Sequence, residues 1–193
     1  MSELIITIAR QNGSGGREVG QILAKLLGIE CYDQEILKKA AEESGISLED
    51  IEKNEERHSK TTKFFGGIPS ANPVFTAQSK AISDLAENGS CVFVGRCADY
   101  VLRDRKDVIN VFIKAPIDER VERSSKRNNI SEKEAFSRVT DKDRERALYY
   151  QRYTGIVWGT VDNYDLSIDT GNIGVENAAK IIVEYARMCG YDI

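Results

Sequence analysis

The chain has 193 residues, the length of one ordinary domain, and its 41% hydrophobic and 30% charged residues exclude a chain that is disordered over most of its length. The formal net charge of −4 argues against duplex nucleic acid as the main partner. No apolar run approaches the roughly 20 residues that cross a bilayer, and no basic region precedes the short apolar stretch near the N-terminus. We therefore expect a cytoplasmic protein without a membrane partner.

The first expected element is a buried strand over residues 4–8, a continuous apolar and β-branched run that leads into the glycine-rich residues 12–16. A helix should follow, because apolar residues recur at three- and four-residue spacing as far as Leu27 and Gly28 is placed to end it. Strand, glycine loop and helix thus form the opening unit.

The middle of the chain predicts a short strand over residues 29–32, helices over 34–43 and 47–56, and a long loop over 57–72. Asn72 and Pro73 are a typical cap and first-turn pair for a helix that extends to about residue 88. An apolar strand over residues 91–94 comes next, and Gly95 and Arg96 follow it.

The second half predicts a strand over residues 108–113 and helical structure over 120–153, with a break at Asn128 and Asn129. Ser131 and Glu134 form a capping box after that break. A short strand over 166–168 and an amphipathic helix over 175–188 end the chain. This alternation predicts an α/β fold with a parallel sheet covered on both faces, and ligands at the carboxyl ends of the strands.

The glycine loop between the first strand and helix predicts a phosphate site, because backbone N–H groups and a helix N-terminus attract anions. The dinucleotide pattern G-x-G-x-x-G fits Gly13 and Gly15 but places Glu18 at its third glycine. The mononucleotide pattern G-x-x-x-x-G-K-[ST] aligns Arg10 with its first glycine and Gly16 with its lysine. Neither pattern is complete.

Basic residues suggest where further phosphates bind. Arg96 follows a strand at the carboxyl edge of the sheet and could hold a second phosphate group, and Asp33 could contact a ribose, hold a water on Mg²⁺ or cap a helix. Seven of the 14 arginines lie between residues 118 and 153, where they form either an ion-paired surface or a set of cations for phosphoryl transfer. They are Arg120, Arg123, Arg127, Arg138, Arg144, Arg146 and Arg152.

Together these residues resemble the cytidylate kinase-like proteins, of the nucleoside monophosphate kinase group of P-loop enzymes, over nearly the whole chain. Asn12-Gly13-Ser14-Gly15 falls on S-G-A-G of the family loop D-G-P-S-G-A-G-K-G-T, and Gly95-Arg96 is similar to its G-R-D motif. Residues 141–146 are similar to its D-R-D-R-N-R. The resemblance implies an acceptor site in which Asp143 contacts a ribose and Lys39, Arg96 and Arg146 contact a phosphate, with Asp33 at its start.

The resemblance also implies a P-loop nucleotide kinase fold, a five-stranded parallel sheet with helices on both faces and a helical lid. Residues 1–193 would form one domain, with a core of 1–33, 89–118 and 155–193, an acceptor-binding region of 34–88 and a lid of about 119–154. The implied activity is transfer of the γ-phosphoryl group of Mg²⁺-ATP to cytidine or deoxycytidine monophosphate.

Three residues depart from the family pattern. Gly16 replaces the lysine of the phosphate loop, Glu18 stands where a Mg²⁺-binding threonine is expected, and Cys97 replaces the aspartate of G-R-D that helps to read the base. Cytosine specificity is therefore not supported. Arg17 or a lid arginine would have to replace the lysine, and a loop of this Gly-Ser-Gly-Gly-Arg-Glu type resembles a divergent branch of the group.

The leading interpretation is ATP-dependent phosphoryl transfer to a small acceptor, most simply a nucleoside monophosphate. A non-catalytic nucleotide sensor or scaffold, which the missing lysine favours, and a kinase for a non-nucleotide molecule remain open. Glu18 argues against a dinucleotide-dependent oxidoreductase. The expected catalytic residues are Arg17, Arg123, Arg127 and Arg138. Those expected to bind ATP are Asn12, Gly13, Ser14, Gly15, Gly16, Arg17 and Glu18, with Mg²⁺ at Glu18.

Overall fold

The computed structural model describes residues 3–33, 35–45, 47, 49 and 72–193. Within them the chain forms a parallel sheet of five strands, as the sequence and its resemblance predicted. The strand order, which was not predicted, is β2-β3-β1-β4-β5. The strands are β1 (Ile5–Arg10), β2 (Glu30–Tyr32), β3 (Cys91–Val94), β4 (Val108–Lys114) and β5 (Leu166–Asp169). The first strand of the chain is therefore the central one.

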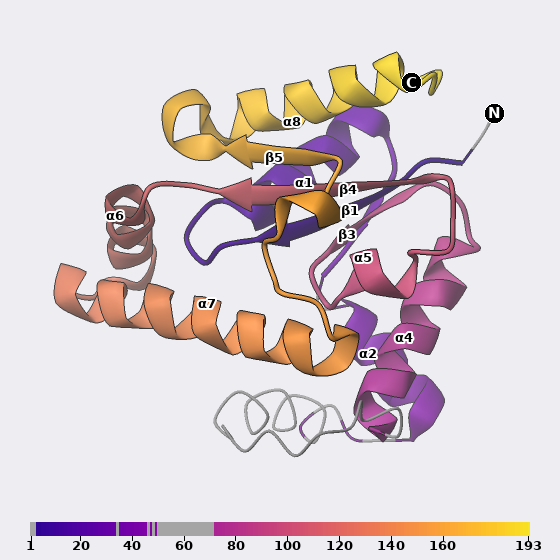
Figure 1. Ribbon diagram of the computed structural model, residues 1–193, viewed down its shortest axis with the longest axis horizontal. Helices are drawn as coiled ribbons and strands as arrows, with labels where there is room; N and C mark the ends of the chain where they lie inside the picture. The colour runs from indigo at the N-terminus through magenta and orange to yellow at the C-terminus, as the bar shows by residue number, and fades with distance from the viewer. Residues whose placement is uncertain (1–2, 34, 46, 48, 50–71) are drawn as a thin grey trace.

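Helices cover both faces of the sheet (Figure 1). On one face lie α1 (Gly16–Leu27) and α8 (Thr170–Met188), and on the other lie α2 (Glu35–Ser44), α4 (Pro73–Ala86) and the short α5 (Ala98–Val101). Two helices, α6 (Ile117–Asn128) and α7 (Glu132–Thr154), pack on each other beyond the carboxyl end of β4. A 3₁₀ turn, η1 (Val161–Asn163), leads into β5.

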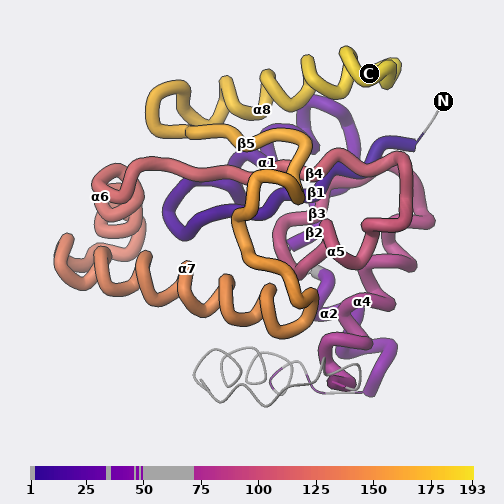
Figure 2. The backbone as a smooth tube through the Cα atoms, in the orientation of Figure 1, coloured from indigo at the N-terminus to yellow at the C-terminus, as the bar shows by residue number. Residues whose placement is uncertain are grey.

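The continuous apolar sequence of β1 follows from burial on both faces. Ile6 and Ile8 pack in the cluster formed with α1 and α8, whereas Ile5 packs in the cluster formed with α2 and α4. Because successive residues of a strand point to opposite faces, a central strand with helices on both sides buries residues on both faces. The buried polar residue of β1, Thr7, donates a hydrogen bond to the Asn110 side chain at 2.6 Å. Figure 2 shows β1 at the middle of the fold, with α8 and α7 on opposite sides.

The local signals for helix ends are confirmed. Gly28 ends α1 in the left-handed conformation, with φ of 67°. The Asn72 side chain accepts hydrogen bonds from the first turn of α4, and Ser131 and Glu134 form the expected capping box of α7. These signals are reliable because cap and helix are neighbours in the chain.

Two α-helices differ from the prediction, and the 3₁₀ turn η1 was not predicted. The sequence did not indicate α5, which has one turn and too few residues for a periodic pattern. The last helix begins at Thr170 rather than at 175, because Asp169 caps its first turn and the non-helical Gly174 joins two helical pieces. Asp169 thus anchors the helix directly to the end of β5.

The helix expected over 47–56 and the loop expected over 57–72 lie outside the described residues, apart from Ser47, Glu49 and Asn72. The division into core, acceptor-binding region and lid stays a prediction. In the described part of the chain, no helix has the length and hydropathy needed to cross a membrane.

Candidate phosphate-binding site

The glycine loop connects β1 to α1 at the carboxyl edge of the sheet. Gly13 and Gly15 have φ of 78° and 81°, and Gly15 is the N-cap residue of α1. A Cβ atom at Gly13 would lie 2.7 Å from the backbone oxygen of Arg120, so this position also requires glycine for space. Within the described part of the chain no side chain caps α1, so the N–H groups of its first turn remain available to an anion.

Arginines from α6 and α7 hold the carbonyl groups of this loop. Arg146 donates to the backbone oxygen of Arg10 at 3.0 Å, and Arg123 donates to that of Gly13 at 2.5 Å. The buried Arg120 donates to the backbone oxygen of Asn12 at 3.2 Å. Part of the arginine-rich segment thus shapes the loop.

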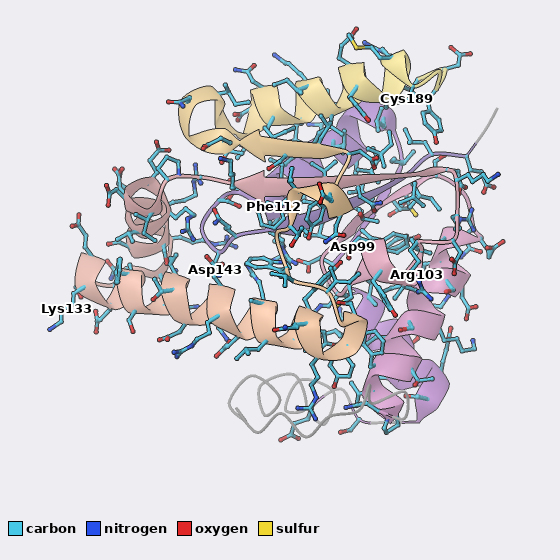
Figure 3. All side chains as sticks on the ribbon, viewed as in Figure 1. Asp99, Arg103, Phe112, Lys133, Asp143 and Cys189 are labelled. Atoms are coloured by element: carbon cyan, nitrogen blue, oxygen red, sulfur yellow. The ribbon has the colours of Figure 1, made fainter. Side chains whose placement is uncertain are left out.

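Two further side chains complete this support. Asp143 accepts the N–H of Asn12 at 2.6 Å and pairs with Arg120 at 2.6 Å, and Figure 3 shows it on the side of α7 that faces the sheet. The Thr170 hydroxyl donates to the backbone oxygen of Ser14 at 2.6 Å. Because these contacts come from α7 and α8, the second half of the chain fixes the loop conformation.

Four arginines gather around Asp33 at the same edge of the sheet. The Nε of Arg17 lies 2.9 Å from one oxygen of Asp33, and a terminal nitrogen of Arg10 lies 3.8 Å from the other. Arg96 and Arg146 are close enough to act electrostatically on Arg10. We call Arg10, Arg17, Arg96 and Arg146 the arginine cluster.

The arginine cluster carries more positive charge than Asp33 neutralises. Burial and the neighbouring Arg146 lower the pKa of Arg10 to about 9, with Asp33 acting in the opposite direction. Burial also lowers the pKa of Arg146, although Asp143 counters it. Since cations are costly to bury beside like charges, the cluster favours the binding of an anion.

The backbone after β3 is unusual. Gly95, Arg96 and Cys97 all have positive φ, of 79°, 61° and 56°. Residues other than glycine adopt this conformation rarely, and such strain concentrates at ligand sites. The turn brings Arg96 into the arginine cluster.

An open cleft of about 540 Å³ lies beside the start of α1. Its lining is mostly cationic: Arg17, Glu18, Gln21, Arg123, Lys126 and Arg127. Glu18 is the one carboxylate among the described residues of that lining. Mg²⁺ in such sites is often bound by one or two carboxylates together with substrate phosphates, so Glu18 fits a metal that enters with a nucleotide. No cluster of three or more His, Cys, Asp or Glu occurs among the residues that the structure describes.

The remaining predicted residues lie apart from these contacts or support the loop. Lys39 pairs with Glu43 at 3.5 Å on α2, and Arg138 is exposed on α7. The buried Ser14 hydroxyl donates to the backbone oxygen of Gln11. Gly16 is buried against the stem of Arg10.

Two contributors, Arg10 and Thr170, were not among the predicted site residues, and Arg120 was named only as one of the seven arginines between residues 118 and 153. For Arg10 there was a signal, because a charged residue that ends a buried central strand requires partners at the sheet edge. For Arg120 and Thr170 the signal was weak, since both act through contacts with residues more than a hundred positions away.

The model of the cytidylate kinase-like family matches residues 5–172. This chain belongs to that family. A cytidylate kinase from Pyrococcus horikoshii is 28% identical over 181 residues, 93% of this chain and 86% of the relative. A cytidylate kinase from Methanosarcina mazei is 31% identical over 172 residues, 86% of each chain.

Solved structures share the fold of this chain. An uncharacterized protein from Eubacterium ventriosum has a TM-score of 0.75 and 28% identity, with 95% of this chain and 98% of that chain covered. Shikimate kinase from Acinetobacter baumannii shares the fold, with a TM-score of 0.55 at 15% identity over 96% of this chain and 93% of its own. Family and fold together support a kinase with a P-loop nucleotide-binding site.

Proposed function

We propose that this chain is an ATP-dependent nucleoside monophosphate kinase, with cytidine monophosphate as the first acceptor to test. One observation carries the proposal: Arg17 lines the cationic cleft beside the glycine loop and also belongs to the arginine cluster. Two anion-binding surfaces therefore adjoin, as transfer between two phosphorylated molecules requires. The names of the curated relatives support the same class of reaction.

On the donor side, ATP would lie over Asn12 to Glu18. Backbone N–H groups of Gly13, Gly15 and Gly16 and the N-terminus of α1 suit its phosphates. The chain has no lysine in this loop, so arginines must supply the positive charge. Mg²⁺, when bound, would neutralise phosphate charge, and Glu18 is the residue we assign to hold it.

On the acceptor side, Arg96 and Arg146 would bind the monophosphate, with Asp143 and Asp33 nearest to a ribose. An Arg fork can bind two phosphate oxygens at once, which orients the attacking oxygen. Lys39 would have to leave Glu43 to join them. Cys97 gives no reason to prefer cytosine over other bases, so the base stays open.

Arg123, Arg127 and Arg138 would act during transfer. Charge develops on the equatorial oxygens of the moving group, and arginines placed there stabilise it. Arg123 and Arg127 line the cleft, whereas Arg138 would need movement of α7 to reach it. Protein groups contribute by position and charge, and none of these arginines exchanges a proton.

The test is ADP release from Mg²⁺-ATP by the purified protein, with a panel of ribo- and deoxyribonucleoside monophosphates and an acceptor-free control. We expect turnover that depends on one acceptor. Tight ATP binding without turnover on any acceptor would instead favour a sensor or a kinase for a non-nucleotide molecule, and absence of ATP binding would contradict the donor site.

Arg146→Ala tests the acceptor side. Loss of a charge-assisted bond to phosphate should raise the KM for the acceptor about tenfold or more, with a smaller change in the KM for ATP. Arg144→Ala is the matched control, because Arg144 is exposed on the same helix and pairs with Asp141. Equal acceptor KM values for the two variants would remove Arg146 from the acceptor site.

A further inference from the structure

Arg10 crosses the space between the glycine loop and the turn after β3. A Cβ atom at Gly16 would lie 2.5 Å from the Cβ of Arg10 and 2.9 Å from its Cγ. A Cβ atom at Gly95 would collide with a terminal nitrogen of Arg10. The stem of Arg10 therefore packs on the backbone of Gly16, and its guanidinium lies against the backbone of Gly95.

This packing links two departures from the mononucleotide pattern. In that pattern Arg10 stands at the first glycine and Gly16 at the lysine. The Cβ of a lysine at position 16 would overlap the stem of Arg10, since no two Cβ atoms approach to 2.5 Å. An arginine at position 10 and a lysine at position 16 therefore exclude each other. The arginine at position 10 requires the glycine at position 16.

The guanidinium of Arg10 lies at the centre of the arginine cluster. Its side chain is only 17% exposed. Arg17 comes from α1, Arg96 from the turn after β3 and Arg146 from α7, while Asp33 follows β2. Asp33 lies closer to Arg17, at 2.9 Å, than to Arg10, at 3.8 Å. Arg10 therefore combines a buried position with a weak partner.

We propose that Arg10 supplies, from the end of β1, the cation that a lysine at position 16 would supply, and that it contacts the phosphates during transfer. The inference rests on the proposed function. In that reaction an acceptor phosphate oxygen forms a bond to the γ-phosphorus with its own electron pair. The bond from that phosphorus to the bridging oxygen breaks, and ADP leaves with the electron pair. Arg10 keeps its proton throughout.

Arg17 is the competing candidate for the same role. Its Nε forms an ion pair with Asp33 at 2.9 Å, although without hydrogen-bond geometry among the described residues, and its side chain is 41% exposed. A phosphate stabilises a solvent-exposed cation beside a carboxylate less than it stabilises a cation that is buried among like charges. The assignment to Arg10 therefore predicts a larger loss for substitution at position 10 than at position 17.

The first experiment compares Arg10→Met with Arg17→Met, because methionine keeps much of the stem and removes the charge. We expect Arg10→Met to weaken binding of the ATP analogue AMP-PNP about tenfold or more by calorimetry, and to lower kcat about 100-fold or more. The Tm of the ligand-free Arg10→Met protein should equal or exceed that of the wild type, because the substitution removes a buried charge that the other arginines of the cluster repel. A merely structural Arg10 would lower Tm.

The second experiment exchanges the two positions. Gly16→Lys alone should lose stability and AMP-PNP binding, because the new side chain meets Arg10. The double variant Arg10→Gly, Gly16→Lys should exceed Arg10→Gly about tenfold in AMP-PNP affinity and in kcat, because it restores both positions of the mononucleotide pattern. Arg187→Met, at an exposed position of α8, is the control for loss of an arginine far from the glycine loop.

The inference is overturned if Arg10→Met keeps AMP-PNP affinity and kcat within about threefold of the wild type, if Arg17→Met loses more, or if the double variant is no better than Arg10→Gly. If the wild type turns over no acceptor, the proposed function fails. The AMP-PNP affinities then still decide whether Arg10 binds phosphate in place of the lysine.

Discussion

Asp99 is a buried acid beside the predicted acceptor region. It is 9% exposed and accepts a hydrogen bond from the hydroxyl of Tyr150 at 2.8 Å. Burial raises the pKa of Asp99 above its usual value, and the Tyr150 hydrogen bond partly offsets the rise. The folded protein thus holds a proton at Asp99 more tightly than the unfolded chain does, so this group lowers stability as pH rises through the raised pKa.

Asp99→Asn should remove that contribution. We expect the variant to lose less stability than the wild type when pH rises to 8 from about 3.5, just below the ordinary aspartate pKa of 3.8, since an amide does not ionise and can still accept the Tyr150 hydrogen bond. Urea denaturation at the two pH values measures the difference. Asp104→Asn is the control: the Asp104 side chain is 88% exposed, so this variant should have the same pH dependence of stability as the wild type. A parallel pH response of Asp99→Asn and the wild type would contradict the prediction for Asp99.

At the scale of elements, helices α6, α7 and α8 hold the glycine loop by its carbonyl groups. Thr170→Val tests one of these contacts without changing side-chain size. The Thr170 hydroxyl donates to the backbone oxygen of Ser14 at 2.6 Å and lies 3.2 Å from that of Lys114. Because valine cannot donate, the free energy of unfolding should fall by about 1–2 kcal/mol. The Tm should fall by about 2–8 °C for a chain of this length.

Thr140→Val is the control for this prediction. The Thr140 hydroxyl bonds to carbonyl groups of its own helix, at Phe136 and Ser137, so its loss should leave Tm within about 2 °C of the wild type. Thermal unfolding followed by circular dichroism measures both variants. Equal Tm values for Thr170→Val and Thr140→Val would mean that the Thr170 contact does not stabilise the loop.

Local sequence signals predicted these elements well and their mutual contacts poorly. The helix beginnings at Asn72 and Ser131 follow from bonds that span two or three residues. The Arg123 contact with Gly13 joins residues 110 positions apart, and no periodicity reports such a contact. The resemblance placed Arg96 and Arg146 in one site because family motifs carry tertiary information. It gave no place to Arg10, where this chain departs from the family.

At the scale of the whole molecule, the excess charge of the arginine cluster should couple anion binding to stability. A ligand at 100 times its dissociation constant stabilises the folded state by about 2.7 kcal/mol. We therefore expect saturating Mg²⁺-AMP-PNP to raise Tm by about 5–10 °C. Differential scanning fluorimetry measures this shift. Potassium chloride at equal ionic strength is the control, and an equal rise in the salt alone would contradict a specific site.

The long separation between the glycine loop and its supports bears on how the protein is made. Ser14 leaves the ribosome 156 residues before Thr170, the residue that holds its carbonyl. At a synthesis rate of about 5–20 residues per second, β1 waits on the order of ten seconds for β4, α7 and α8. Until then the glycine loop lacks the contacts from α6, α7 and α8 that hold its carbonyl groups. The phosphate-binding conformation of the loop is therefore completed last, when nearly the whole chain has been made.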